Sequence, residues 1–207
     1  GASHRDHRGH PLEPTGLDPT SAPSAAIGEI VHYNILEGLT KINADGSVTP
    51  LLAESWSVSD DGKVYTFKLR QGVKFQDGEE FDSAAVKYSY DRAKAEGSTN
   101  KAKKAVFDNV TQIAAPDKST VVLTLANPDG NLLFRLGENT AVIVGSKSIA
   151  TGATKPVGTG PYKFDNWNKG TSVTLSKWDG YRDAAAVKIN RVTFRFINDA
   201  SAQVAAL

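Results

Sequence analysis

The sequence predicts a mixed α/β (α+β) fold, and three observations support this prediction. In VYTFKLR, the side chains of Tyr65, Phe67 and Leu69 alternate with polar ones, which is typical of a half-buried strand. Apolar residues recur at helical spacing after Ser24 and again over residues 83–96. The chain has 207 residues, which is long enough to bury a sizeable core made of both kinds of element.

The composition excludes several classes of protein. The net charge is only +1, and the Lys and Arg residues are dispersed among Asp and Glu, so nucleic acid is not expected as a partner. The chain has no Cys, which removes disulfides, thiolate metal sites and thiol nucleophiles. No apolar run reaches the roughly 18 residues needed to span a bilayer. The composition is that of an ordinary globular protein, and no cofactor is expected.

The N-terminal part of the chain predicts a tail followed by a helix. Residues 1–12 contain three His residues without apolar periodicity, and we expect a disordered arm or an expression remnant. Pro19 and Pro23 then make a rigid lead-in, and Ser24 is a candidate N-cap. The apolar spacing that follows predicts a helix ending near Gly38, with a turn over residues 43–47.

The segment LRQGVKFQDGEEFDSAAVKYSYDR is predicted to be scaffold. Asp77-Gly78 is a turn signal, and Asp82 is placed to cap a helix over residues 83–96. Glu79 and Glu80 are adjacent in the turn and would point apart, which makes them a poor acid–base pair. The predicted buried face of the helix consists of Val86, Ser89, Tyr90 and Ala93.

The remaining strands are predicted from alternation and turn residues. Residues 110–114 and 120–125 form one expected hairpin, and residues 162–167 and 171–177 form a second around Asn168-Lys169-Gly170. RVTFRFI supplies a further strand, and Asp199 is expected to cap a final helix over residues 200–207.

Catalytic and nucleotide-binding interpretations are disfavoured. Outside the tail the chain has a single His, His32, which lies in a predicted helix, and no Ser lies in a nucleophile-elbow pattern. In Gly158-Thr159-Gly160 the following Pro161 removes an N–H donor that a phosphate loop would need. We expect a tight turn before a strand there, and no enzymatic activity.

A long central segment and five further motifs give the chain a family resemblance. The central segment is DGKVYTFKLRQGVKFQDGEEFDSAAVKYSYDR, and the others are EPTGLDPT, LAESW, PVGTGPYKF, WDGYRD and VTFRFINDASAQVAAL. In this order they resemble the bacterial extracellular solute-binding proteins of family 5, the peptide-, dipeptide- and nickel-binding components of ABC importers. The resemblance runs from about Glu13 to Leu207.

The resemblance implies a periplasmic-binding-protein-like type II fold that is present only in part. Members of the family are much longer, so the distal lobe and at least one strand of the proximal lobe are expected to be absent. After the tail, residues 13–42 and 149–207 would form two segments of the proximal lobe, and residues 43–148 a nested β-rich domain.

The resemblance also implies a ligand-facing edge, formed by the segment after LDP. By position, Ser21, Ala22, Ser24 and Ile27 are the expected ligand-binding residues, and the N-terminus of the following helix would favour a carboxylate. The alternative, that Ser24 is only an N-cap and Ile27 only a core residue, stays open.

The function implied is that of the substrate-binding component of an ABC importer, present as a fragment. The expected partners are a small-molecule solute, with peptides favoured, and a membrane permease, and the expected location is periplasmic or extracellular near the bacterial inner membrane. The alternative is a truncated lobe with a structural role, which would self-associate through exposed edges and bind no ligand of its own.

Overall fold

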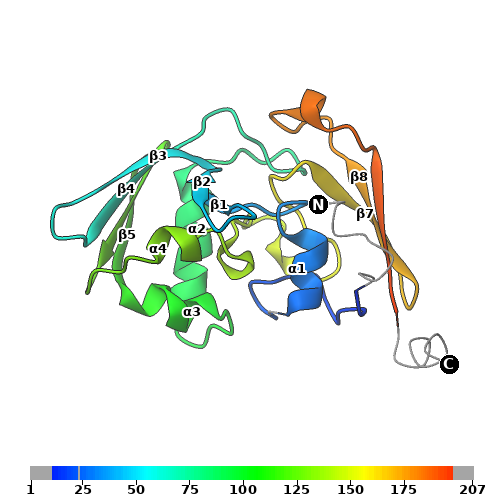
Figure 1. Ribbon diagram of the computed structural model, residues 1–207, viewed down its shortest axis with the longest axis horizontal. Coiled ribbons are helices and arrows are strands. Elements are labelled where there is room, and N and C mark those ends of the chain that lie inside the picture. Colours follow the sequence, from blue (N-terminus) through cyan, green and yellow to red (C-terminus); the bar gives the residue numbers. More distant parts are fainter. Residues whose placement is uncertain (1–10, 23, 198–207) are drawn as a thin grey trace.

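The computed structural model describes residues 11–22 and 24–197, whose strands form three antiparallel sheets. Figure 1 shows the four-stranded and the three-stranded sheet at opposite ends of the molecule, with α1, α2 and the β1–β2 hairpin between them. The elements are α1 Ala25–Val31, β1 Thr40–Ile42, β2 Val48–Pro50, β3 Ala53–Val58, β4 Val64–Leu69, α2 Ser83–Lys94, α3 Ala102–Ala105, β5 Val110–Asp117, β6 Thr120–Leu125, α4 Leu132–Arg135, β7 Tyr162–Asn168, β8 Ser172–Lys177 and β9 Arg191–Arg195. Short 3-10 helices occur at Phe107–Asn109, Asn139–Ala141, Ile149–Thr151 and Ala184–Ala186.

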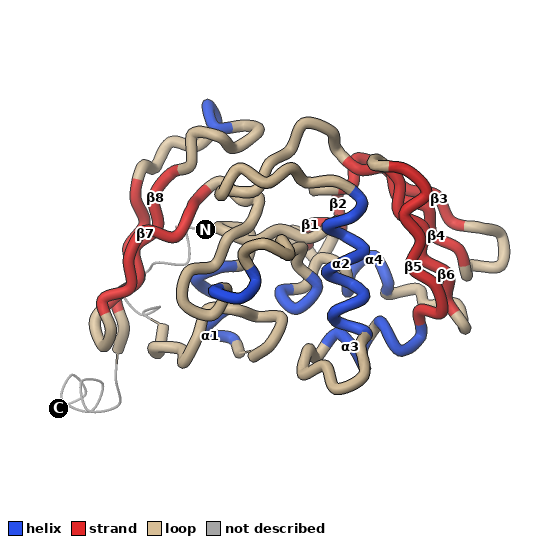
Figure 2. The backbone as a smooth tube through the Cα atoms, turned by 180° about the vertical axis from the view of Figure 1, so that it is seen from behind, coloured by secondary structure: helices blue, strands red, loops and turns tan. Residues whose placement is uncertain are grey.

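The four-stranded sheet has the order β3-β4-β6-β5, with α2 packed along it (Figure 2). The predicted alternation in β4 is confirmed, because Tyr65, Phe67 and Leu69 are buried while Lys68 between them is exposed. The predicted hairpin is confirmed as β5 and β6. Period-two alternation therefore places one apolar face of this sheet against α2 and leaves the other face to solvent.

Helix α2 forms where the sequence predicts it and ends two residues earlier, at Lys94. The Asp82 carboxylate accepts a hydrogen bond of 2.9 Å from the Ala84 N–H and so caps the helix. Beyond its C-terminus, Gly97 has a φ of +81°, a conformation that favours glycine. The predicted buried face is confirmed: Val86, Ser89, Tyr90 and Ala93 are all buried.

The three-stranded sheet has the order β7-β8-β9 and packs against α1. The predicted hairpin of β7 and β8 is confirmed, with Gly170 at a φ of +83° in its turn. Glu13 fastens the N-terminal segment to this turn, because one carboxylate oxygen accepts hydrogen bonds from the Trp167 indole N–H at 2.9 Å and the Gly170 N–H at 2.7 Å. The helix expected over residues 200–207 lies outside the described residues.

Buried apolar side chains form two clusters. One is drawn from residues between Leu39 and Ile143, and the other from residues 17–36, 142–144 and 162–194. The extended segment Val142–Val144 lies between them: Ile143 belongs to the first cluster, and Val142 and Val144 belong to the second. Alternation along one short segment therefore joins the two cores.

The predicted length of α1 is wrong, because the helix ends at Val31 and not near Gly38. Tyr33 has a φ of +64°, which reverses the chain, and the Asn34 side chain turns back to donate a hydrogen bond to the Ile30 carbonyl at 3.0 Å. The carbonyls of Asn34 and Ile35 then accept hydrogen bonds from the Tyr162 and Gly160 N–H groups, both at 2.9 Å. Contacts with a segment more than 120 residues away in the chain thus override the local helical spacing.

Candidate functional site

The loop before α1 is shaped by a buried aspartate. The Asp18 side chain accepts hydrogen bonds from the Thr20 N–H at 2.9 Å and from the Ser21 hydroxyl at 3.1 Å. Asp18 is 6% exposed, and the rigid Pro19 follows it directly. These contacts fix residues 18–22 as a compact turn, which we call the edge loop.

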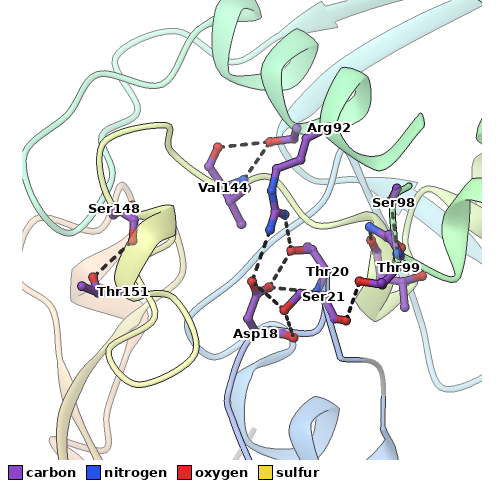
Figure 3. Close-up of polar contacts among 12 residues, drawn as sticks. Asp18, Thr20, Ser21, Arg92, Ser98, Thr99, Val144, Ser148 and Thr151 are labelled. Carbon is purple, nitrogen blue, oxygen red and sulfur yellow. Dashed lines mark hydrogen bonds and ion pairs between the residues drawn. The ribbon is translucent and has the colours of Figure 1, made fainter. Parts of the chain in front are cut away.

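One residue of α2 and one residue of the loop after it hold the edge loop in place (Figure 3). Arg92 donates a hydrogen bond of 2.7 Å to the Thr20 hydroxyl, and a second guanidinium nitrogen lies 3.7 Å from an Asp18 carboxylate oxygen. The Thr99 hydroxyl donates to the Ser21 carbonyl at 2.9 Å. Arg92 and Thr99 belong to the part of the chain that forms the first apolar cluster, and Asp18 directly follows Leu17 of the second. The edge loop therefore spans the junction between the two cores.

The four residues expected to bind ligand lie in and directly after the edge loop. Ser21 is half-exposed, Ala22 and Ser24 are exposed, and Ile27 is buried with 2% of its surface accessible. Ser24 caps α1, since its hydroxyl accepts a hydrogen bond from the Ile27 N–H at 3.3 Å. The structure therefore presents Ser21, Ala22 and Ser24 at the surface and places the Ile27 side chain in the core; their part in ligand binding stays a prediction.

The N-terminus of α1 is a weaker anion site than the sequence suggests. The helix has seven residues, so its dipole is short, and the Ser24 cap already engages the Ile27 N–H. A recognition role for this region would therefore depend mainly on the exposed backbone and side chains of the edge loop.

A hollow of about 720 Å³ adjoins the edge loop, and it was not predicted from the sequence. No residue of the edge loop lines the hollow, and the link between them is Thr99, which lines the hollow and donates a hydrogen bond to the Ser21 carbonyl. A volume of this size is within the roughly 300–1,000 Å³ of small-molecule sites. The lining residues are Ser98, Thr99, Asn100, Lys101, Ala102, Lys103, Lys104, Ala105, Val106, Arg135, Glu138 and Thr140. The signal that could have indicated it is the lysine-rich run TNKAKKA at residues 99–105.

A second polar cluster lies at the Gly158-Thr159-Gly160 turn. The Glu37 carboxylate, whose side chain is 3% exposed, accepts two hydrogen bonds from the Arg182 guanidinium, at 2.8 and 3.0 Å. The Thr159 hydroxyl donates to the same carboxylate at 2.8 Å. The turn precedes β7 directly, as predicted, and Thr159 uses its hydroxyl to satisfy a buried acid. Glu37 and Thr159 are buried, and the exposed Arg182 covers them from the surface; we call these three residues the buried clasp.

His32 is a half-buried, neutral side chain whose Nε2 atom is buried. Its ring stacks on Tyr33 with 3.8 Å between centroids, and the Nε2 atom has no hydrogen-bond partner among the described residues. Burial lowers the pKa of His32 to about 4, and the nearby Gly137 carbonyl, which favours the protonated form, does not offset this. The arrangement suits a core residue better than a catalytic base.

Acidification is expected to destabilise the protein through His32. Its pKa is about 4 in the folded state and 6.5 in the reference state, so between these values the unfolded chain binds more protons and the free energy of unfolding falls as the pH falls. From pH 7 to pH 5 the loss due to this residue should be about 2 kcal/mol. Urea unfolding of the protein and of His32→Gln at pH 7, 6 and 5 measures it. We expect a shallower pH dependence for the variant, and parallel curves would contradict the assignment.

None of the helices within residues 11–22 and 24–197 has the length and hydrophobicity of a membrane-spanning segment. In the same part of the chain no three His, Asp or Glu side chains are gathered in a way that could hold a metal ion. The three His residues of the N-terminal tail lie outside the described residues.

The volume of the hollow is typical of small-molecule sites, and the edge loop beside it is exposed and polar. Sequence comparison identifies the family: the sequence model of the bacterial extracellular solute-binding proteins, family 5 Middle, matches residues 47–207. The chain belongs to this family, as its motifs predicted. The family consists of solute-binding proteins found in the periplasm or outside the cell.

Individual relatives agree with this assignment. The glutathione-binding protein GsiB of Escherichia coli K12 is 33% identical over 197 residues, which cover 93% of this chain and 38% of that protein. The structure of the binding protein AgaA from A. tumefaciens R10 in complex with agropinic acid superposes with a TM-score of 0.83 at 35% identity, over 95% of this chain and 40% of that one. For the periplasmic binding protein DppA of Helicobacter pylori in complex with the peptide STSA, the TM-score is 0.81 at 28% identity, over 95% and 43%.

The predicted fold class is confirmed by these superpositions. The chain spans only about 38% of the length of the curated relatives it matches, and about 40% of the AgaA chain. It is therefore similar to one part of a periplasmic binding protein.

Proposed function

We propose that this chain is part of the solute-binding component of an ABC importer and that its solute is a peptide. The observation that carries the proposal is the edge loop, which exposes Ser21 and Ala22 while the buried Asp18 and the Arg92 side chain hold their backbone in place. A preformed loop of this kind can offer backbone and hydroxyl groups to an extended peptide at little entropic cost. The relatives bound to the peptide STSA and to glutathione support this solute class.

The mechanism follows from a two-lobed binding protein. We propose that the edge loop lies on the ligand-facing side of the proximal lobe, whose two segments are residues 13–42 and 149–207 around a β-rich unit at residues 43–148. A solute that contacts both lobes binds the closed form more tightly and shifts the equilibrium toward it. The closed form would then dock on a membrane permease, in the periplasm or outside the cell near the inner membrane.

A non-enzymatic role is part of the proposal. His32 is half-buried and its pKa is lowered, which leaves the described residues without an exposed imidazole base. The Gly158-Thr159-Gly160 turn uses its groups within the fold, since the Gly158 N–H donates to the Gln76 side chain and Thr159 to Glu37.

The chain by itself is expected to bind peptides weakly. A micromolar complex corresponds to about −8 kcal/mol, so if the rest of the protein supplies half of that, the remainder corresponds to a Kd of about 1 mM. Titration of the isotope-labelled chain with the tripeptide Ala-Ala-Ala, followed by NMR, tests this. We expect shifts of the Ser21, Ala22 and Ser24 amide signals with a Kd of about 1 mM.

Two results would overturn the proposal. Shifts that avoid the edge loop would move the site elsewhere, for example to the hollow of about 320 Å³ lined by Gln76, Lys155 and Lys163. A micromolar Kd would mean that this chain holds the complete site.

Self-association, the alternative role, has no specific support. The exposed large apolar side chains of the described residues lie on four separate segments and form no single patch, and sedimentation velocity would detect any dimer. They are Leu12, Val58, Phe134 and Ile189.

A further inference from the structure

The Gln76 side chain reaches from the first core to the backbone of the second. It lies in the segment between β4 and α2, next to Phe75 of the first cluster. Its Oε1 atom accepts a hydrogen bond from the Gly158 N–H at 2.9 Å. Its Nε2 atom donates to three carbonyls: Ile35 at 3.2 Å, Gly160 at 3.0 Å and Tyr162 at 2.7 Å. One amide thus joins the end of the α1 turn, the 158–160 turn and the start of β7.

The position requires an amide, because its surroundings offer both acceptors and a donor. A carboxylate in place of Gln76 would turn a second oxygen toward the three carbonyls, and an apolar side chain would leave those carbonyls and the Gly158 N–H without this partner. The Gln76 N–H also donates to the Gly158 carbonyl at 2.9 Å, so both polar groups of the Gly158 backbone are bonded to this residue.

The segment that Gln76 holds lies directly behind the edge loop. Residues 156–157, which precede Gly158, line a small void together with Asp18. A few residues earlier, the Ala153 carbonyl accepts a hydrogen bond from the Leu17 N–H at 2.7 Å. The edge loop therefore rests on residues 153–157 on this side, and Gln76 fixes the end of that support.

We infer that Gln76 is a positioning residue of the solute site, which keeps the edge loop in its binding shape through residues 153–160 and does not touch the solute. The inference rests on the proposed function and adds a residue to it. A loop that holds its binding shape only part of the time binds with an affinity reduced by that fraction. Loosening the support should therefore weaken binding from behind the site.

The test uses Gln76→Met and Gln76→Glu in the isotope-labelled 207-residue chain. NMR first compares the Ser21, Ala22 and Ser24 amide signals without solute, and titration with Ala-Ala-Ala then gives the Kd. We expect these signals to move in both variants at pH 7.5, and the Kd to rise about fivefold if the loop keeps its binding shape about a fifth of the time.

Lowering the pH should reverse the effect of Gln76→Glu. Protonation gives the new side chain one O–H donor, and the surrounding carbonyls favour this neutral form and raise its pKa. At pH 5.5 the edge-loop signals of Gln76→Glu should return toward those of the parent chain at the same pH, while those of Gln76→Met stay displaced. A residue that only adds to overall stability would not move these signals in this pattern.

Two control variants separate positioning from other effects. Gln112→Glu introduces the same charge at an exposed position of β5 and should leave the edge loop unchanged. Val121→Ala lowers stability by removing buried methyl groups from β6 and should leave the edge-loop signals and the Kd unchanged as well.

Each outcome is decisive. If the Gln76 variants keep the parent's edge-loop signals and Kd, the inference is overturned and the proposed function stands. The same holds if Val121→Ala moves the edge loop as much as they do. If Ala-Ala-Ala shifts the Gln76 side-chain amide signals of the parent chain as strongly as the edge loop, Gln76 contacts the solute and the positioning role is wrong. If Ala-Ala-Ala shifts no edge-loop signal of the parent, the proposed function fails and the inference fails with it.

Discussion

Replacing Gly158 with alanine should destabilise the protein by about 3 kcal/mol or more, because a methyl group at this position overlaps the backbone of another segment. A Cβ atom on Gly158 would lie 2.1 Å from the Ile35 carbonyl oxygen and 2.7 Å from a methyl carbon of Leu36. The turn cannot retreat easily, since the Gly158 N–H and carbonyl are both hydrogen-bonded to Gln76 at 2.9 Å. Urea unfolding measures the loss.

The matched control is Gly130→Ala. A Cβ atom on Gly130 would meet no other atom within 4 Å, and the residue does not have a positive φ, so the free energy of unfolding should change by less than about 0.5 kcal/mol. Equal losses for the two variants would show that the close approach of residues 158 and 35 is not what the glycine provides.

Elements with complete local signals were predictable from the sequence. Helix α2 has a capping aspartate at Asp82, an apolar face of regular period and a glycine at Gly97, and it formed within two residues of the prediction. The hairpin of β7 and β8 carries its alternation and its turn glycine together. In both cases the information lies within about 15 residues, where propensity and periodicity act.

Features made by distant segments were not predictable. The end of α1 depends on the Asn34 and Ile35 carbonyls binding the 160–162 segment, and nothing within the helix itself specifies this. For the candidate site, the LDP motif predicted a ligand-facing segment that overlaps the edge loop at Ser21 and Ala22. The hydrogen bond between Ser21 and Thr99 joins residues 78 positions apart, and the sequence did not predict it. A lysine-rich run shows charge in a sequence, but only the fold shows which of its charges lack a partner.

Removing the arginine of the buried clasp should cost up to about 3 kcal/mol, because the buried Glu37 carboxylate loses two charge-assisted hydrogen bonds, while the exposed position of Arg182 lets water replace part of them. Arg182→Met leaves the Glu37 carboxylate with the Thr159 hydroxyl as its closest remaining donor, at a position where the Glu37 side chain is 3% exposed. Arg182→Lys should fall between, because an ammonium group cannot reproduce the two parallel hydrogen bonds. Urea unfolding of each variant gives the free energies.

A double substitution distinguishes the pair from simple loss of packing. If the cost comes from an uncompensated charge, Glu37→Leu combined with Arg182→Met should recover much of it, since a buried ion pair replaced by apolar groups is often close to neutral. The control is Arg135→Met, which breaks an exposed pair with Glu138 at 2.9 Å and should cost less than about 1 kcal/mol. Should the double variant be no more stable than Arg182→Met, the clasp would act through the packing of the 158–162 turn. The Thr159 hydroxyl and the glycines beside it would then matter more to the junction of the two cores than the charges do.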